Sequence, residues 1–261
     1  MKAVILAGGT QSTINNEYEG IPKPMIEVGG RPLLWHIMKH FFRYGINDFI
    51  ICGGYRIDLI KAYFMDYYIY QSDITVNLAE NVIEIHKKKT EDWKVTVVDT
   101  GLYSSTAKRI SLIKDYIDED MFLTIYGDCL SDINISELIS VHTREKKTAT
   151  MVVAKPSGRN KLLSINNSGQ ICDGNEQDMN EHAWVNANCF LFNKDIFQYL
   201  REEIELEDEF VFSLAEKQLL GTYQHRGFWS TIETRRDLMK AEHMWKTRTA
   251  PWIKFKTKEF V

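Results

Sequence analysis

The sequence predicts an α/β fold in which helices cover a largely parallel sheet, and three observations support this fold class. The chain opens on an apolar run that ends in paired glycines, Met1–Gly9. Strand and helix patterns then alternate through the first half, with a glycine-rich turn between them twice. The 261 residues, 44% hydrophobic and 26% charged, are enough to bury one large core. We therefore expect one domain that spans residues 1–261.

The first strand, turn and helix are predicted within residues 2–45. The apolar run Lys2–Leu6 predicts a buried strand, and the paired glycines Gly8 and Gly9 predict a turn that lets backbone N–H groups approach a phosphate. Residues Pro32–Tyr44 carry apolar side chains at helical spacing, and Gly45 ends the predicted helix. This order is typical of a nucleotide-binding α/β unit.

The second unit repeats the first. A strand is predicted over Phe49–Cys52, the paired glycines Gly53 and Gly54 follow it, and an amphipathic helix continues to about Tyr70. Because the carboxyl ends of parallel strands meet at one edge of a sheet, we expect Gly53 and Gly54 to lie beside the first turn and to line the same pocket.

The middle of the chain supplies a candidate carboxylate. The strongly apolar strand predicted over Met121–Tyr126 ends in Gly127 and Asp128. Ligands of open α/β sheets bind beyond the carboxyl ends of the strands, so Asp128 either reaches a metal or a nucleotide, or caps the following turn. Other elements expected here are strands over Thr75–Leu78, Glu84–His86 and Val95–Val98, and a helix over Ser105–Tyr116.

The second half is predicted to continue the sheet and to carry loops over the ligand side. The polar region Lys155–His182 predicts hairpins and loops, and the acidic stretch Glu202–Glu209 predicts a solvated helix end. The tail Trp252–Phe255 either packs back or binds a partner. The other elements expected are helices over Ser136–Lys146 and Asp237–Trp245 and strands over Thr148–Val153 and Cys189–Phe192.

Composition argues against several classes of function. The net charge of −4 argues against a general binder of nucleic acid or of membrane surfaces. The four cysteines show no CxxC spacing, which predicts free thiols rather than disulfides or a zinc site. We expect a cytoplasmic protein, because no basic and apolar leader and no membrane-length segment is present.

Taken together, the motifs resemble those of the sugar-phosphate nucleotidyltransferases, and among them the bacterial glucose-1-phosphate cytidylyltransferases. The resemblance covers nearly the whole chain, and its specificity comes from the order and spacing of many short stretches. These are Met1–Gly9, Pro22–Met25 with Glu27, Gly29–Gly30, Leu34–Met38, Asp48–Tyr55, Ala79–Asn81, Val98–Gly101, Tyr126–Asp128, Gly227–Trp229 and Ala250–Trp252.

The resemblance implies a fold and a reaction. The fold is a Rossmann-like, mostly parallel mixed sheet flanked by helices, of the GT-A-like kind, with a smaller sugar-binding region; residues 1–150 would form the nucleotide-binding core and 151–261 the acceptor-binding and assembly region. The family makes CDP-glucose and pyrophosphate from CTP and glucose 1-phosphate with a divalent metal, normally Mg²⁺. A homo-oligomer, or a complex with a paralogue, is the expected assembly.

The resemblance also assigns roles to residues. Lys23 matches the cation that reaches the nucleotide phosphates, and Asp128 matches the metal-binding aspartate, with Glu233 at the place of the second metal-binding carboxylate. Asp128 and Lys23 are therefore the expected catalytic residues. The remaining assignments are Leu6, Ala7, Gly8, Gly9, Gly53 and Gly54 for the nucleotide and Glu176 and Asn186 for the acceptor.

The chain departs from the family pattern at charged positions. Gln11 stands where the family has the third glycine of its first turn, and Thr13 stands where it has an arginine. Gln177 stands where the family has the lysine that holds the sugar phosphate. Arginine is always charged and clamps phosphate with two hydrogen bonds, whereas threonine offers one neutral hydroxyl. Losing one such group commonly costs roughly 3 kcal/mol of transition-state stabilisation.

Side chains also replace pocket glycines, and cations elsewhere offer a substitute for the missing charge. Ala187 and Asn188 align with one pair of family glycines, and Ala107 and Lys108 align with another. Lys108 with its neighbour Arg109, and Arg159 with Lys161, lie in segments expected to border the site. Each of the four either restores positive charge or is an ordinary exposed residue, and exposure is the commoner state of such residues.

Two functions remain open on the sequence. The first is a nucleotidyltransferase that still works with impaired activity or a changed sugar phosphate, which the retained Lys23, Asp128 and Glu233 favour. The second is a catalytically silent member that binds a nucleotide or sugar nucleotide as a regulatory or partner subunit, which Gln11, Thr13 and Gln177 favour.

Overall fold

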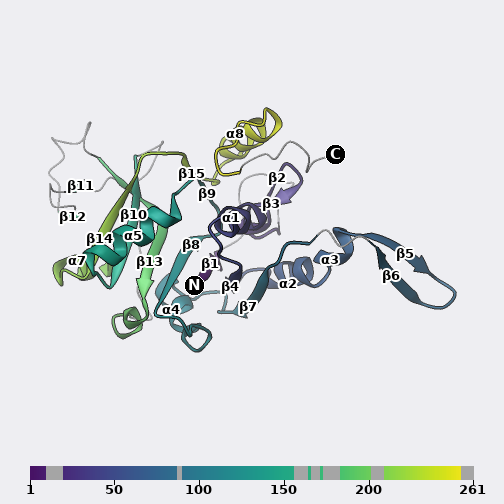
Figure 1. Ribbon diagram of the computed structural model, residues 1–261, viewed down its shortest axis with the longest axis horizontal. Helices are drawn as coiled ribbons and strands as arrows, with labels where there is room; N and C mark the ends of the chain where they lie inside the picture. The colour runs from purple at the N-terminus through teal and green to yellow at the C-terminus, as the bar shows by residue number, and fades with distance from the viewer. Residues whose placement is uncertain are drawn as a thin grey trace.

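A seven-stranded sheet forms the centre of the molecule (Figure 1). The computed structural model describes residues 1–9, 20–86, 90–155, 164–165, 171–172, 183–200 and 209–253. The strands follow one another across the sheet as β14 (Leu220–His225), β10 (Ala149–Ala154), β13 (Val185–Asn193), β8 (Met121–Tyr126), β1 (Lys2–Ala7), β4 (Asp48–Gly53) and β7 (Lys94–Asp99).

The sheet is mostly parallel, as predicted. Strand β1 pairs in parallel with β4 and β8, β4 pairs in parallel with β7, and β10 pairs in parallel with β14. Strand β13 is antiparallel to both β8 and β10. The predicted α/β fold with a mostly parallel mixed sheet is therefore confirmed.

Helices cover both faces of the sheet, so its central strand β1 is buried on both sides, which explains its continuous apolar sequence. Side chains alternate between the faces of a strand, so Ala3 and Ile5 pack on one side and Val4 and Leu6 on the other. The first side is covered by α1 (Leu33–Phe42), α2 (Ile57–Met65) and α5 (Ile135–Glu145), and the second by α4 (Thr106–Ser111) and α7 (Val211–Glu216).

Two predicted helices are each interrupted. The helix expected to continue to Tyr70 is divided at Asp66 into α2 and α3 (Tyr67–Tyr70). The helix expected over Ser105–Tyr116 is divided into α4 and the 3-10 helix η3 (Lys114–Tyr116). Ser105 begins α4 by accepting a hydrogen bond from the backbone N–H of Lys108 at 3.1 Å, which satisfies one of the free donors of the first turn.

Several short elements had no clear sequence signal. Strand β14 contains Gly221 and shows no alternation of apolar and polar side chains, so its sequence does not predict a strand. It forms one because it pairs with β10 at the edge of the sheet. The others are α7 and the two-stranded sheets β9 (Cys129–Ser131) with β15 (Trp229–Thr231) and β2 (Glu27–Val28) with β3 (Arg31–Pro32).

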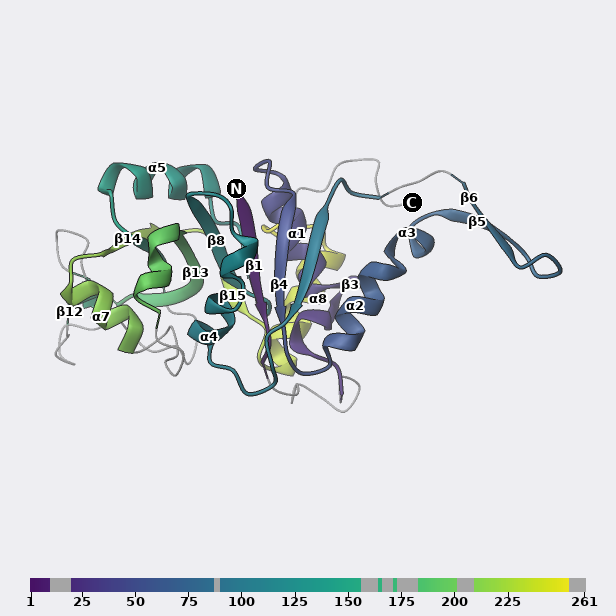
Figure 2. The same ribbon diagram turned by 90° about the horizontal axis from the view of Figure 1, so that it is seen from below.

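A hairpin of β5 (Asp73–Asn77) and β6 (Val82–His86) projects from the body of the molecule beyond α2 and α3 (Figures 1 and 2). Of the region Lys155–His182, the structure describes Lys155 and the antiparallel pair β11 (Ser164–Ile165) and β12 (Ile171–Cys172). The rest of that region, and the acidic stretch Glu202–Glu209 apart from Glu209, lie outside the described residues.

The C-terminal part packs back onto α1. Helix α8 (Arg235–Lys246) begins with a capping box between Thr234 and Asp237. Trp252 is 1% exposed and its Nε1 donates to Nδ1 of His36 at 3.2 Å, which confirms that the tail packs back at this residue. Cys52, Cys129 and Cys189 are unpaired, and within the described part of the chain no helix has the length and apolarity to span a membrane.

Candidate functional site

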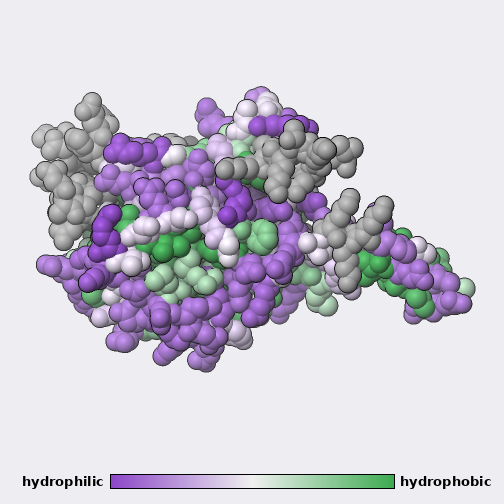
Figure 3. All heavy atoms as spheres, viewed as in Figure 1, coloured by the Kyte–Doolittle hydropathy of each residue, from purple (hydrophilic) through white to green (hydrophobic). Residues whose placement is uncertain are grey.

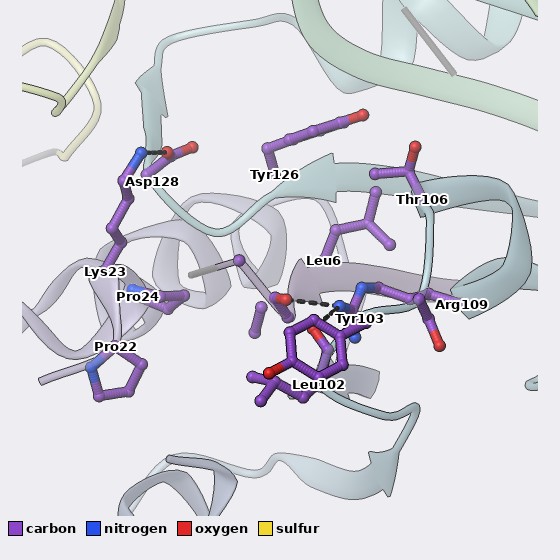
Figure 4. A pocket seen from close by; sticks show the side chains of 14 residues that line it. Leu6, Pro22, Lys23, Pro24, Leu102, Tyr103, Thr106, Arg109, Tyr126 and Asp128 are labelled. Atoms are coloured by element: carbon purple, nitrogen blue, oxygen red, sulfur yellow. Dashed lines mark hydrogen bonds and ion pairs between the residues drawn. The ribbon is translucent and has the colours of Figure 1, made fainter. Parts of the chain in front are cut away.

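A cavity of about 420 Å³ opens at the carboxyl ends of β1 and β8 (Figure 4). Its walls come from four segments that lie far apart in the sequence: the end of β1, the segment before β2, the loop and start of α4, and the end of β8. The lining residues are Leu6, Ala7, Gly8, Gly9, Pro22, Lys23, Pro24, Leu102, Tyr103, Ser104, Thr106, Arg109, Tyr126 and Asp128.

The predicted turn after β1 forms one wall of this cavity. Leu6, Ala7 and Gly8 are buried and Gly9 is exposed. Residues 10–19, which include Gln11 and Thr13, lie outside the described residues. The structure thus brings the first four predicted nucleotide-binding residues into one wall.

Lys23 and Asp128 meet on the neighbouring wall. Nζ of Lys23 lies 3.3 Å from Oδ2 of Asp128, and Figure 4 shows this contact at the edge of the cavity. Lys23 begins the 3-10 helix η2 (Lys23–Met25), which packs against Gly127 so closely that a Cβ there would lie 2.6 Å from Cγ of Pro24. Glycine at position 127 therefore allows the two charged residues to approach.

The surroundings of Asp128 disfavour its charge. Burial raises the pKa of the Asp128 carboxyl above its ordinary value of 3.8, the ammonium of Lys23 lowers that pKa in part, and the carboxylate of Glu233 raises it again. The backbone N–H of Ile232 donates to the Asp128 carbonyl at 2.9 Å, which holds the Glu233 segment against the end of β8. A cation at this place would relieve the repulsion between the two carboxylates.

Arg109 forms the back of the cavity and is only 4% exposed. Its guanidinium extends from α4 across the ends of three strands. It donates to the carbonyls of Gly8 at 2.6 Å, Gly101 at 2.7 Å, Leu102 at 3.2 Å and Gly53 at 3.4 Å. The side chain thus ties together the loops that follow β1, β4 and β7.

The position of Arg109 excludes one of the two alternatives given for it, and the close packing around it explains why glycine occupies positions 8 and 54. Arg109 is not an ordinary exposed residue, because its guanidinium fills the space beside Gly8, where a Cβ would collide with it. At Gly54 a Cβ would lie 3.0 Å from the carbonyl oxygens of both Gly8 and Gly101. Lys108 is half-buried and does not line the cavity. Arg159 and Lys161 lie outside the described residues.

Gly53 and Gly54 lie behind the cavity rather than in its lining. The carbonyl of Gly53 accepts from the backbone N–H of Thr100 at 3.0 Å and from its Oγ1 at 2.7 Å. These contacts join the ends of β4 and β7. Their assignment as nucleotide ligands stays a prediction, and the geometry gives them a part in holding the loops together.

An exposed tyrosine stands at the cavity and was not singled out from the sequence. Tyr103 is 92% exposed, and Figure 4 shows its ring beside Leu102 and Arg109 at the edge of the cavity. The loop that carries it is held by the bonds of Arg109 to Gly101 and Leu102 and by Gly101 N–H donating to Oδ1 of Asp99 at 3.0 Å. Only the three-dimensional position of the loop reveals this residue.

Asn186 of β13 carries an unused hydrogen-bond donor. Its Oδ1 accepts from the backbone N–H of Asn188 at 2.8 Å, while its Nδ2 is buried and has no hydrogen-bond partner among the described residues. Asn188 has a φ of +56°, a left-handed conformation that glycine and asparagine adopt most readily. Asn186 does not line the cavity around Lys23, and Glu176 lies outside the described residues.

A divalent cation fits Asp128 and Glu233 in part. The described residues include no group of three or more His, Cys, Asp or Glu side chains that would hold a metal alone. Mg²⁺, however, usually binds through one or two carboxylates together with water and substrate phosphates. Asp128 and Glu233, whose negative charges interact near the end of β8, are two carboxylates of the kind that such a site uses.

Comparison with known proteins identifies the family. The family model for nucleotidyl transferases matches residues 2–247. The chain belongs to the nucleotidyl transferase family. It is 40% identical over 254 residues to the glucose-1-phosphate cytidylyltransferase of Salmonella typhimurium, covering 97% of this chain and 98% of that protein. It is 35% identical to a probable glucose-1-phosphate cytidylyltransferase of Bacillus subtilis, covering 97% and 99%.

Solved structures of nucleotidyl transferases share the fold. HddC from Yersinia pseudotuberculosis superposes with a TM-score of 0.72 at 19% identity and covers 94% of this chain and 99% of that chain. A UDP-glucose pyrophosphorylase complexed with UDP-glucose superposes with a TM-score of 0.70 at 14% identity, covering 95% and 98%. The predicted resemblance is therefore confirmed for both the sequence family and the fold.

Proposed function

We propose that the cavity binds CTP and that the protein transfers the cytidylyl group to a sugar 1-phosphate, glucose 1-phosphate first, with release of pyrophosphate. The observation that carries the proposal is the meeting of the β1 turn, Lys23 and Asp128 at one cavity. The 40% identity to a glucose-1-phosphate cytidylyltransferase supports the choice of nucleotide and acceptor. Mg²⁺ and a cytoplasmic location belong to the same proposal.

The transfer reaction requires the protein to position both substrates and to neutralise the negative charge of their phosphates. The oxygen of the sugar phosphate attacks the α-phosphorus of CTP in line, and the bond to the pyrophosphate breaks. Backbone N–H groups at Gly8 and Gly9 hold the phosphates, and the ammonium of Lys23 neutralises them once it leaves Asp128. Asp128 and Glu233 would hold Mg²⁺, which supplies charge neutralisation at the transferring group.

Fewer residues are assigned to the binding of the sugar phosphate than to the binding of CTP. The buried and unpartnered Nδ2 of Asn186 is a donor suited to a sugar hydroxyl, and Glu176 is the expected acceptor of a second hydroxyl. Residues 1–150 would then carry the nucleotide and 151–261 the sugar phosphate.

We expect the transfer to be slow compared with that of the relatives. Thr13 and Gln177 replace two cations, and each loss commonly lowers a rate about a hundredfold or more. The guanidinium of Arg109 does not substitute for them freely, because it is engaged by loop carbonyls. The geometry thus supports a working but weakened phosphate site.

A second candidate function is nucleotide binding without transfer. It is favoured by the internal pairing of both described cavity cations, Lys23 with Asp128 and Arg109 with the strand ends. Such a protein would bind a nucleotide or CDP-sugar and act as the regulatory partner of an active paralogue.

Pyrophosphate release distinguishes the two functions. Purified protein is incubated with Mg²⁺ and CTP, with and without glucose 1-phosphate, and with UTP, dTTP or GTP in place of CTP. We expect release that needs both substrates, is fastest with CTP and is abolished by Asp128→Ala. The matched control is Asp115→Ala, which removes an exposed carboxylate outside the cavity.

Release that survives Asp128→Ala would show contamination or a different site and would contradict the proposal. CTP binding without any release over long incubation would reject transfer and establish the second candidate. Faster release with another nucleoside triphosphate would correct the nucleotide and keep the reaction.

A further inference from the structure

The cavity contains two cations, and they differ in how firmly the protein holds them. Among the described lining residues they are Lys23 and Arg109. The guanidinium of Arg109 is buried and donates to four backbone carbonyls. The side chain of Lys23 is 33% exposed, and within the described part of the chain its ammonium pairs with one carboxylate, that of Asp128 (Figure 4). Lys23 is therefore the cation that can change partners.

The contact between Lys23 and Asp128 is long for an ion pair. Nζ and Oδ2 lie 3.3 Å apart, whereas a hydrogen bond between a charged nitrogen and a carboxylate is commonly about 2.7–2.9 Å long. A lysine ammonium is carried on a flexible stem of four carbons, so it can take up several positions around one backbone site. The ammonium can therefore leave the carboxylate without breaking a short hydrogen bond.

The backbone around Lys23 is constrained on both sides. Lys23 lies between Pro22 and Pro24, and each proline ring fixes the φ angle of its own residue. The Lys23 carbonyl accepts from the backbone N–H of Ile26 at 3.0 Å, and Pro24 packs against Gly127. The ammonium of Lys23 can therefore move within the cavity while the backbone that carries it stays in place.

Asp128 is held in place independently of Lys23. The backbone N–H of Ile232 donates to the Asp128 carbonyl at 2.9 Å, and the N–H of Gly127 donates to the Leu6 carbonyl at 2.9 Å. These bonds tie the end of β8 to β1 and to the segment that follows β15. The backbone that carries the carboxylate therefore keeps its place when the ammonium moves. Asp128 is also the one acidic residue among the described residues that line the cavity.

We propose that Lys23 and a divalent cation compete for the carboxylate of Asp128, and that Lys23 is released toward the nucleotide phosphates when the carboxylate takes the cation. The inference rests on the proposed function, because that function brings the phosphates to the β1 turn. A carboxylate that is largely removed from water needs a positive partner, and the side chain of Asp128 is only 17% exposed. Lys23 is that partner until a cation replaces it.

Repulsion between like charges enforces the competition. Two positive charges beside one carboxylate repel each other, most strongly where the surroundings exclude water. Because the carboxylate of Asp128 is mostly buried, dissolved ions screen this repulsion only in part. The phosphates of a nucleotide offer the displaced ammonium a second partner of opposite charge. Cation and nucleotide should therefore strengthen each other's binding, since coupling between two ligands is reciprocal.

A fixed structural ion pair would behave differently. If Lys23 served only to hold the carboxylate of Asp128 in position, Lys23→Met would misplace that carboxylate and weaken metal binding. If Lys23 competes with a cation, the same substitution frees the carboxylate and strengthens metal binding. The sign of the change in metal affinity therefore distinguishes competition from structural support.

Mn²⁺ binding without nucleotide, followed by the EPR signal of the free ion, tests the competition on the full chain. Mn²⁺ takes the same oxygen ligands as Mg²⁺. We expect Lys23→Met to bind Mn²⁺ about fivefold or more tightly than the wild type, because a competing charge is removed. Lys23→Arg keeps a cation and should bind as the wild type does. The matched control with wild-type affinity is Lys94→Met, which removes the same charge from an ion pair with Asp48 outside the cavity.

An affinity of Lys23→Met for Mn²⁺ that is unchanged, lower or too weak to detect would overturn the proposal. So would an equal gain in Lys94→Met, or a gain that persists when Lys23→Met is combined with Asp128→Asn, because the ion would then bind elsewhere. Thermal unfolding checks that each variant is folded, and Lys23→Gln takes the place of Lys23→Met if the latter is not. Since no nucleotide is present, a failure of CTP binding would refute the proposed function without changing the Mn²⁺ result.

Discussion

The cavity and the projecting hairpin of β5 and β6 differ in where their side chains find partners. In the cavity the charged groups are satisfied within one chain: Arg109 by carbonyls at the ends of three strands, and Lys23 by Asp128. In the projecting hairpin, which with the end of α2 and α3 we call the arm (Met65–His86), most apolar side chains of β5 and β6 face solvent (Figure 3). The described charged groups of the cavity thus have partners within one chain, whereas the apolar side chains of the projecting hairpin have little cover among the described residues.

This difference predicts that substitutions in the two regions have different consequences. Buried hydrogen bonds organise the loops that hold a ligand, and their loss is felt in the stability of a single chain. Exposed apolar surface contributes little until it is covered, and its loss is felt in association. Substitutions in the two regions should therefore change different measured quantities.

The largest effect is expected at Arg109. Arg109→Leu removes the donors that satisfy buried carbonyls of three loops, so we expect a loss of about 3–5 kcal/mol in the free energy of unfolding. Urea unfolding measures it. Arg144→Leu is the control, because Arg144 is exposed and its ion pair with Glu145 is long at 3.7 Å. Equal stability of the two variants would refute the role given to Arg109.

The next effect is expected in affinity rather than stability. Tyr103 is exposed at the cavity on a loop held by Arg109, and we expect its ring to stack on the nucleobase of the proposed CTP. Tyr103→Ala should weaken CTP binding about tenfold with an unchanged melting temperature, because base stacking on an aromatic ring is worth about 1–3 kcal/mol. Tyr103→Phe should bind as the wild type does. If alanine binds equally well, Tyr103 does not contact the nucleotide.

At Asp128 we expect a substitution to increase the free energy of unfolding, by less than Arg109→Leu decreases it. Because its folded pKa is raised, the ionised carboxylate destabilises the ligand-free protein above that pKa, and the penalty disappears as the pH falls and the group is protonated. Asp128→Asn should raise the free energy of unfolding at pH 7.5, because the neutral amide removes the penalty of burying an ionised carboxylate. The gain should shrink toward pH 4. If Asp128→Asn is less stable than the wild type at pH 7.5, the ionised carboxylate of Asp128 does not destabilise the ligand-free protein.

The smallest effect on the single chain is expected in the arm. Ile83→Thr keeps a β-branched residue in an exposed strand, so we expect less than about 0.5 kcal/mol of change in the unfolding of the monomer. Urea unfolding followed by fluorescence at nanomolar protein concentration measures the stability of the monomer separately from any association. A loss above 2 kcal/mol would show that the arm is already packed within its own chain.

Local sequence patterns predicted the central strands of the sheet and the turns that follow them. The apolar run of β1, the glycines after it and the Gly127–Asp128 end of β8 were all readable because each depends on a few neighbouring residues. The resemblance assigned Lys23 and Asp128 to one site, but their ion pair was not predicted, since 105 positions separate them. The break at Asp66 was missed because apolar spacing continues through it into α3.

The sequence was least informative where one side chain joins distant loops. Arg109 belongs to an ordinary amphipathic helix pattern, and nothing local shows that it reaches the turn after β1, whose Gly8 is 101 positions away. Tyr103 was missed for the same reason, because its place at the cavity depends on how its loop is held. The apolar alternation of β5 and β6 predicted strands, but burial depends on a partner that the alternation does not name.

Isothermal titration with CTP and Mg²⁺ tests directly whether this cavity is a nucleotide site. We expect one CTP to bind per chain, with an affinity reduced at least tenfold by Lys23→Met. Lys94→Met is the matched control, because Lys94 pairs with Asp48 at 3.1 Å away from the cavity and should bind as the wild type does. No binding by the wild type, or equal binding by Lys23→Met, would show that this cavity is not the nucleotide site.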